Sequence, residues 1–457
     1  MQSPYRSIHE LAVPSIQTGS YPARPGNALR PLIDGQPAFR RICEAIEAAR
    51  HSVWATVTFM WADFQMPDRR GSALHVLSRA AARGLDVRLI FWRPDPETEY
   101  LKTNAFWGAT EHFQLLKETS DSAVRIRWDR AQPGFCQHQK SWLIDAGTDA
   151  DIAFVGGINL NPHSLVAPGH RGEKQNHDVY LEMAGPSAVD VHHNFAQRWN
   201  EASERHAPDG RWGSGSETDL PFPTRVPSRR GDALVQIQRT IHSGRYRDGR
   251  ATPEGAPFDI EEGERSSFDQ YCAAISAARR SIYLEHQHVD VPEIIDCLRQ
   301  ALSRGVEVVA VTPAEANVSE GLLALGAFET FTLAGIAGLA SDGQRKPVWV
   351  HSKLMIVDGE WGTVGSCNLH RYSLFGNCEL NAAFWDQKTA RALFSELLRE
   401  HLDREVSGMD ELSALRLFRA IAADNGKLFR AGEPAWQGLA FSRFEMPRSS
   451  VPLHRPT

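Results

Sequence analysis

The sequence predicts a fold of the α/β class: two pseudo-symmetric α/β sandwich domains with mixed sheets, which share a site at their interface. The chain has 457 residues, more than one hydrophobic core usually supports. Helix-like and strand-like segments alternate along it, and the same series of segments occurs twice in the same order. Its 42% hydrophobic and 23% charged residues exclude a disordered or fibrous protein.

The first repeated unit is a helix followed by a strand. In residues 37–59, the apolar side chains of Phe39, Ile42 and Ile46 recur at helical spacing before a run of β-branched and aromatic residues. Residues 267–288 repeat this pattern. Each segment therefore predicts a helix that covers the strand following it.

The second repeated unit is a helix that ends at a glycine and leads into a buried strand. Residues 73–92 match residues 294–313, and Gly84 and Gly305 end the two helices. The offset between matching positions falls steadily from 229 residues at the first unit to 209 at the last. Shorter loops in the second copy would produce this decrease, so the chain is interpreted as a tandem duplication.

Changes in composition predict the domain boundaries. We expect an N-terminal domain over 25–200, a linker rich in Pro, Gly, Ser and charge over 201–231, a C-terminal domain over 232–406, and a tail over 407–457. One helix is expected in the tail, from Asp410 to Ala423.

No apolar segment has the length of a membrane-spanning helix, and the first residues lack the apolar core of a signal peptide. The longest apolar stretch, Gly321 to Ala340, is predicted to form a buried helix plus a turn. The six cysteines show neither metal-ligand spacing nor disulfide density, and are expected to be reduced core thiols. These features predict a cytoplasmic protein, although export without a signal peptide stays open.

The chemistry of the chain is expected to come from the pattern H-x-K-x4-D, which occurs at matching places in the two copies. From the counts of His, Lys and Asp, about 0.02 such patterns are expected by chance, so two are not accidental. The first pattern consists of His138, Lys140 and Asp145, and the second of His351, Lys353 and Asp358.

The spacing within the pattern separates its residues into two kinds. His138 and Lys140 are two apart, so on a strand both side chains project from one face and can line one pocket. Asp145 is seven residues from His138 and projects from the opposite face. Asp145 and Asp358 are therefore interpreted as anchors of the strand, with the alternative that they belong to the catalytic set.

Glycine-rich segments follow both patterns, at residues 156–159 and 365–368, and would let the backbone approach a ligand closely. They place an amide side chain near each His–Lys pair, and in the second copy a hydroxyl as well. The candidate phosphate-binding residues are thus Lys140, Lys353, Asn159, Asn368 and Ser366.

Two carboxylates open the strands that come next, Asp178 in the first copy and Glu379 in the second. They could hydrogen-bond the imidazoles and so fix the tautomer and the orientation of each ring. Asp178 and Glu379 are therefore added to the candidate catalytic residues.

Two histidines, two lysines and two asparagines from pseudo-symmetric halves suggest a phosphodiester site at the domain interface. One histidine would attack phosphorus to give a covalent phosphohistidine. The other would protonate the leaving oxygen and then deprotonate the water or alcohol that resolves the intermediate. Lysines and asparagines supply positive charge and donors without a metal, so neither a metal nor a cofactor is expected.

The paired H-x-K-x4-D patterns, each followed by G-[GS]-x-N, resemble the phospholipase D superfamily over nearly the whole chain, from about Asn27 to about Glu405. The second pattern fits the family spacing, whereas the first has a four-residue insertion, DADI, before its Gly-Gly-Ile-Asn. The resemblance implies two α/β domains with a shared central cleft. It implies His138 as the nucleophile and His351 as the acid and base, and the sequence leaves the reverse assignment open.

Two subgroups of this superfamily compete. Residues 282–288 and 233–240 resemble phospholipases D that release phospholipid headgroups, which is the preferred interpretation. Residues 361–381 resemble cardiolipin synthases, which pass a phosphatidyl group to the alcohol of another lipid. A nucleic-acid phosphodiesterase is the third alternative, and the net charge of -6 argues against a nucleic-acid partner. The expected partners are a phospholipid, the surface of a membrane, and water or an alcohol as acceptor, with the chain acting as a monomer.

Two further groups of residues have weaker interpretations. Five histidines cluster in the first copy, but their spacing fits no common zinc pattern, so no metal site is predicted. They are His163, His170, His177, His192 and His193. Six aromatic residues are candidates for an acyl-chain groove or a membrane contact. These are Phe59, Trp61, Phe64, Trp92, Phe106 and Trp107.

Overall fold

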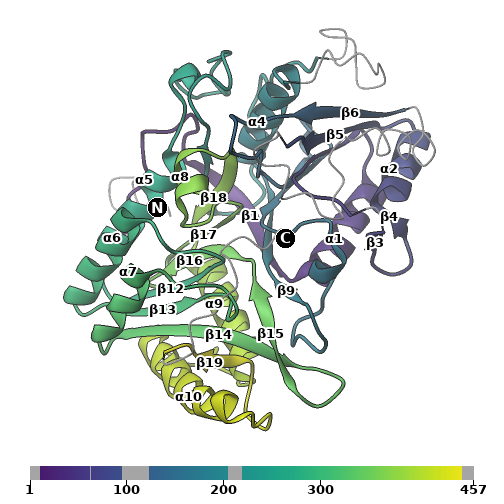
Figure 1. Ribbon diagram of the computed structural model, residues 1–457. Helices are drawn as coiled ribbons and strands as arrows, with labels where there is room; N and C mark the ends of the chain where they lie inside the picture. The colour runs from purple at the N-terminus through teal and green to yellow at the C-terminus, as the bar shows by residue number, and fades with distance from the viewer. Residues whose placement is uncertain (1–10, 62, 95–122, 204–218, 445–457) are drawn as a thin grey trace.

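The computed structural model describes residues 11–61, 63–94, 123–203 and 219–444 (Figure 1). Its main sheet is a continuous network of 17 strands, in which two groups of seven strands have the same topology. The α/β class and the presence of two similar halves are confirmed. The two halves are joined more closely than two separate domains would be, because strand β1 (Arg24–Ile33) of the first half pairs with β11 (Ala233–Thr240) of the second.

In the first half the strand order is β6-β5-β2-β7-β8-β10-β1, with β2, β5 and β6 parallel and the other pairs antiparallel. Each strand of this half is short, and a helix or a loop connects it to the next. The elements are β1, α1 (Gly35–Ala48), β2 (Ser52–Val57), β3 (Gln65–Met66), β4 (Gly71–Ser72), α2 (Ala73–Ala82), β5 (Asp86–Trp92), β6 (Val124–Asp129), β7 (Ser141–Ile144), β8 (Ile152–Gly156), η3 (Pro162–Ser164), β9 (Asn176–His177), β10 (Val179–Ala184) and α4 (Ala188–Asn200).

The second half repeats this order as β14-β13-β12-β16-β17-β18-β11. Two further strands, β15 and β19, pair with β14. The elements are β11, η5 (Ile260–Glu262), α5 (Ser266–Ala277), β12 (Ser281–His286), α6 (Pro292–Ser303), β13 (Glu307–Val311), α7 (Glu320–Ala324), η6 (Leu325–Ala327), β14 (Phe331–Leu339), β15 (Arg345–Val350), β16 (Lys353–Val357), β17 (Trp361–Gly365), α8 (Arg371–Phe375), β18 (Glu379–Trp385), α9 (Gln387–Leu402), α10 (Glu411–Ala431) and β19 (Ala440–Ser442).

Three large apolar cores hold these layers together. One lies between α1, α2 and the first sheet, and a second between α5, α6 and the second sheet. The third and largest contains residues of both halves, including side chains of α4, α9 and α10. The two sheets therefore bury one face against their own helix pair and share the core on the other face, which fixes the halves against each other.

The aspartates of the two H-x-K-x4-D patterns hold the backbone turn before a neighbouring strand. Asp145 accepts hydrogen bonds from the backbone N–H groups of Arg50 (2.9 Å) and His51 (2.6 Å), just before β2. Asp358 does the same before β12, where it accepts from Arg280 and Ser281, each at 2.8 Å. These contacts agree with the interpretation of both aspartates as anchors, because their oxygens are used up by backbone donors.

Two sequence-based expectations about secondary structure are wrong. Most of the stretch 321–340 forms strand β14 and not a helix, because its small residues let two further strands, β15 and β19, pack against it. The tail helix continues past Ala423 to Ala431. Gly426 does not end it, because a Cβ there would lie 3.1 Å from the backbone oxygen of Ser442, so glycine is what allows β19 to pack closely.

We expect Asp145→Asn to lower thermal stability while leaving turnover per folded molecule unchanged. The change removes charge from hydrogen bonds that are worth about 1.5–3 kcal/mol each when one partner is charged. Differential scanning fluorimetry and kcat on the same preparation would check this, with the exposed Asp149→Asn as the control. Loss of kcat at an unchanged Tm would show instead that Asp145 acts in catalysis.

Candidate active site

Backbone pairing carries each H-x-K segment to the opposite half of the molecule. The N–H of His138 donates to the carbonyl of Cys378 at 2.9 Å, and the N–H of Cys378 donates back to Cys136 at 3.0 Å. On the other side β15 runs parallel to β9, and the N–H of His351 donates to the carbonyl of His177 at 2.8 Å. In both cases the residue that follows the pairing partner in the chain is a carboxylate.

Each imidazole is held by the carboxylate of the other half. His138 Nδ1 lies 2.8 Å from Glu379 Oε2, and His351 Nδ1 lies 2.6 Å from Asp178 Oδ2. All four residues are buried. The sequence indicated that these carboxylates face imidazoles, and the structure adds that the pairs are crossed between the halves. A neutral ring that donates from Nδ1 keeps the lone pair of Nε2 for a ligand.

The two carboxylate–imidazole pairs differ electrostatically. Burial by itself would raise the pKa of Glu379, but the charge of His138 and the hydrogen bond between them lower it overall. Burial raises the pKa of Asp178 to about 7 and lowers the pKa of His351 well below its ordinary value. Burial also lowers the pKa of His138. Glu379 is thus the fully charged member of the four, and His138 is a neutral imidazole at pH 7.

The two lysines are buried beside the histidines and lack a carboxylate partner of their own among the described residues. Lys140 Nζ donates to the carbonyl of His138 at 2.8 Å and to Thr58 Oγ1 at 3.2 Å. Lys353 Nζ donates to the carbonyl of His351 in the same way, and lies 3.5 Å from Gln287 Oε1. Burial lowers the pKa of Lys140 to about 8 and that of Lys353 to about 7. A bound phosphodiester anion would supply the missing negative charge.

The two asparagines are buried with unused polar atoms. Among the described residues, both side-chain atoms of Asn159 and the Oδ1 of Asn368 have no hydrogen-bond partner. A small cavity of about 190 Å³ is lined by Asn159 together with Lys140 and Thr58. These are the features expected of donors that wait for a ligand, because a buried polar group without a partner is otherwise costly.

Ser366 has a different place from the one expected for a phosphate-binding residue. Its hydroxyl donates to Glu379 Oε2 at 2.6 Å and accepts from the N–H of Leu380 at 3.0 Å. The equivalent residue in the first half is Gly157, where a Cβ would lie 2.4 Å from Asp178 Oδ1. Each glycine-rich segment thus supports the carboxylate of its own half, and through it the imidazole of the other.

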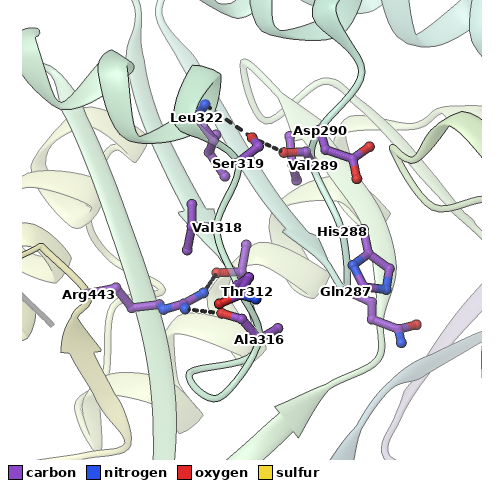
Figure 2. A pocket seen from close by; sticks show the side chains of 11 residues that line it. Gln287, His288, Val289, Asp290, Thr312, Ala316, Val318, Ser319, Leu322 and Arg443 are labelled. Carbon is purple, nitrogen blue, oxygen red and sulfur yellow. Dashed lines mark hydrogen bonds between the residues drawn. The ribbon is translucent and has the colours of Figure 1, made fainter. Parts of the chain in front are cut away.

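A larger pocket, of about 410 Å³, opens beside the second H-x-K segment at the ends of β12 and β13 (Figure 2). Gln287 and His288 stand on one side of it, and Arg443 on the other donates to Thr312 Oγ1 and to the carbonyl of Ala316. Gln287 also contacts Lys353, so the pocket adjoins the candidate phosphate site. The sequence singled out residues 282–288 as a resemblance, but assigned no role to Gln287, His288 or Arg443.

The remaining candidates are spread over the first half. His192 and His193 lie on α4 and His163 packs against Trp61, so these three do not join the other two histidines of the cluster. His170 and His177 meet each other and Asp34. Of the aromatic residues, Phe59, Phe64 and Trp92 are buried and Trp61 is half-buried, whereas Phe106 and Trp107 lie outside the described residues. All six cysteines are free thiols.

Comparison with known proteins identifies the family. The family described as "Cardiolipin synthase, PLD-like domain" matches residues 42–199 and 271–401. The chain is 26% identical over 415 residues to cardiolipin synthase A of Pseudomonas entomophila, covering 89% of this chain and 75% of that protein. It is 24% identical over 383 residues to cardiolipin synthase of Listeria welshimeri, covering 82% and 69%.

A solved structure shares the fold. The phosphatidylserine synthase of Haemophilus influenzae Rd KW20 superposes with a TM-score of 0.53 at 12% identity, covering 91% of this chain and 98% of that one. The chain therefore belongs to the family of phospholipase D-like domains of cardiolipin synthase, and is an enzyme of the phospholipase D superfamily. Within the described residues, none of the helices is both long and apolar enough to cross a bilayer.

Replacement of Glu379 by Gln should lower kcat by about 10²–10⁴, the range that positioned acid–base groups supply. Gln keeps the size of the side chain, but its NH₂ group can face Nδ1 and favour the wrong tautomer of His138. Steady-state kinetics on a soluble phosphodiester, with circular dichroism to confirm folding, would measure the effect. Glu182→Gln, at a carboxylate paired with Arg41, is the control. Full activity of Glu379→Gln would contradict the proposed hold on His138.

The buried lysines predict a loss of activity at alkaline pH. A lysine with a pKa of about 7 or 8 loses its charge as pH rises through that value, so kcat/KM should fall as the pH increases from 7 to 9. In Lys140→Gln the like charge beside Lys353 is gone, which favours the charged form of Lys353. The residual activity of this variant should decline at a higher pH than that of the wild type. Identical profiles would exclude the lysines as the titrating groups.

Proposed function

We propose that this protein is a phosphatidyltransferase of the cardiolipin synthase type, which transfers a phosphatidyl group from one phospholipid to the alcohol of another. The observation that carries the proposal is the pair of buried imidazoles, each held at Nδ1 by a carboxylate of the opposite half. The relatives named cardiolipin synthase favour transfer to a lipid alcohol over the hydrolysis that the sequence first indicated.

In the first step, His138 Nε2 attacks the phosphorus of the donor lipid. The N–P bond forms as the P–O bond to the leaving alcohol breaks, and His351 gives its proton to the leaving oxygen. Glu379 stabilises the positive charge that develops on His138, and the ammonium groups of Lys140 and Lys353 bind the phosphoryl oxygens. The donor headgroup leaves as an alcohol, and the phosphatidyl group stays on His138.

In the second step the acceptor alcohol takes the place of the leaving group. His351 removes its proton, the oxygen attacks phosphorus, and the N–P bond breaks to return His138 to its starting state. The amides of Asn159 and Asn368 are the further candidate donors to the phosphoryl oxygens in both steps. Asp145 and Asp358 keep the turns in place and contact no reacting atom in this scheme.

The pocket of Figure 2 is the candidate site for the acceptor. It adjoins Lys353 through Gln287, and its lining offers the polar side chains of Gln287, His288 and Thr312. Hydroxyl groups of a polyol headgroup could hydrogen-bond there while one of them reaches the phosphorus. A site that orients an alcohol in this way favours alcohol over water through proximity.

Phospholipase D hydrolysis is the second candidate, because water can resolve the same intermediate. Incubation with phosphatidylglycerol vesicles separates the two. A diphosphatidyl product plus glycerol supports the transferase, whereas phosphatidic acid plus glycerol supports hydrolysis. If the lipids stay intact and DNA or bis(p-nitrophenyl) phosphate is cleaved, the third alternative is right. Sedimentation with the same vesicles tests the proposed peripheral contact with a membrane.

The roles of the histidines are tested by trapping the intermediate. In His351→Ala the first step can proceed with a donor whose leaving group needs no proton, such as a p-nitrophenyl ester, while the second step lacks its base. Mass spectrometry should then find the phosphoryl adduct on His138. His138→Ala is the matched variant and should form no adduct. An adduct on His351 in that variant would reverse the assigned roles.

A further inference from the structure

A second group of buried polar side chains lies behind the active site, and the reaction proposed above does not use it. Asp34 follows β1, His170 lies in the loop after η3, His177 is on β9, and Glu400 is on α9. Three of them come from the first half of the chain and Glu400 from the second. The first three are fully buried, and the side chain of Glu400 is 5% exposed.

These four residues point one ligand-type atom each to a common centre. His170 Nε2 lies 3.2 Å from Asp34 Oδ2, 3.4 Å from Glu400 Oε1 and 3.2 Å from His177 Nδ1. His177 Nδ1 lies 3.0 Å from Asp34 Oδ1. Ligands at the zinc–nitrogen and zinc–oxygen distances of about 2.0–2.1 Å are about 3.3 Å apart along the edge of a tetrahedron. The observed separations therefore have the size of a four-coordinate zinc site.

Hydrogen bonds within the protein do not satisfy this arrangement. A ring nitrogen carries at most one hydrogen, so His170 Nε2 can donate to only one of the three atoms around it. Asp34 Oδ2 is buried and accepts no hydrogen bond among the described residues. A carboxylate oxygen that is buried without a partner is costly, and a cation bound between the four atoms would remove that cost.

The surroundings also have the form of a metal site. His177 turns its other nitrogen, Nε2, to Glu285 Oε2 at 3.0 Å, which is the carboxylate–histidine contact that orients metal-bound imidazoles. Glu285 is fixed in turn by Tyr283 at 2.6 Å and Ser352 at 2.7 Å. The charges of Asp34 and Glu400 together equal that of a divalent cation, so the occupied site would be neutral.

We propose that Asp34, His170, His177 and Glu400 bind a structural Zn²⁺ ion that fastens helix α9 of the second half to the first half. Four protein ligands leave no open position, which is typical of structural and not catalytic zinc. The carbonyl of His177 accepts the N–H of His351, and the next residue is Asp178. The ion would therefore hold the segment that positions one of the two imidazole pairs. This proposal departs from the sequence-based expectation of no metal, because Asp34 and Glu400 are far from the two histidines in sequence.

Metal content is the direct test. The full chain, made in zinc-supplemented medium without a polyhistidine tag, should contain about one zinc per molecule by elemental analysis. His170→Gln and Glu400→Gln should each lose most of it. His163→Gln removes a histidine of the same loop that is outside the cluster, and should keep its zinc. Folding of every variant is checked by circular dichroism.

Two further measurements make the result independent of variants that fail to fold. Removal of the ion by a chelator should lower the Tm of the wild type, and added zinc should restore it. Cobalt-substituted wild type should show the visible bands of tetrahedral Co²⁺ without a thiolate charge-transfer band. A folded wild type that contains no zinc and binds neither ion would overturn the proposal. Zinc retained in folded His170→Gln and Glu400→Gln would overturn it as well, because the ion would then be bound elsewhere.

Discussion

The active site depends on the exchange of carboxylates between the two halves. A short parallel backbone contact places Cys378 against the segment of His138, and a second places His177 against the segment of His351. Each contact delivers the next residue, Glu379 or Asp178, to an imidazole of the other half. Neither half therefore contains a complete histidine–carboxylate pair, and the pairing of the halves is a condition for catalysis and not only for stability.

The second constraint is the burial of positive charge next to these pairs. The ammonium groups of Lys140 and Lys353 are bonded mainly to carbonyl oxygens, which offer partial and not full negative charge. Burying a cation in this way costs free energy, and the large shared core has to offset it. A phosphodiester anion gains from the same arrangement, because donors that are already desolvated and oriented need no rearrangement when charge develops at phosphorus.

The sequence predicted the duplication, the four motif residues and the anchoring aspartates, because each of these follows from local spacing. Strand parity separated Asp145 from His138, and the contacts of Asp145 agree with it. The crossed partners could not be predicted, because they depend on pairing between residues about 170 to 240 positions apart. The convergence of Asp34 and Glu400 on two histidines is equally non-local. Strand β14 was missed for another reason, since an apolar run has no period that distinguishes a buried strand from a buried helix.

The duplication is not symmetric at the site, and the difference fits two unequal roles. In the first half, the Asp178 carboxylate lies against Gly157, where any Cβ would collide with it. In the second half, the longer Glu379 reaches further, and Ser366 fills the position of that glycine and donates to the carboxylate. The hydroxyl adds a donor to Glu379, which keeps this carboxylate ionised beside His138. Asp178 has no such hydroxyl, and burial leaves its pKa near 7. The better-stabilised anion thus stands behind the imidazole that would carry positive charge as the nucleophile, so the single change from glycine to serine is enough to distinguish the two halves chemically.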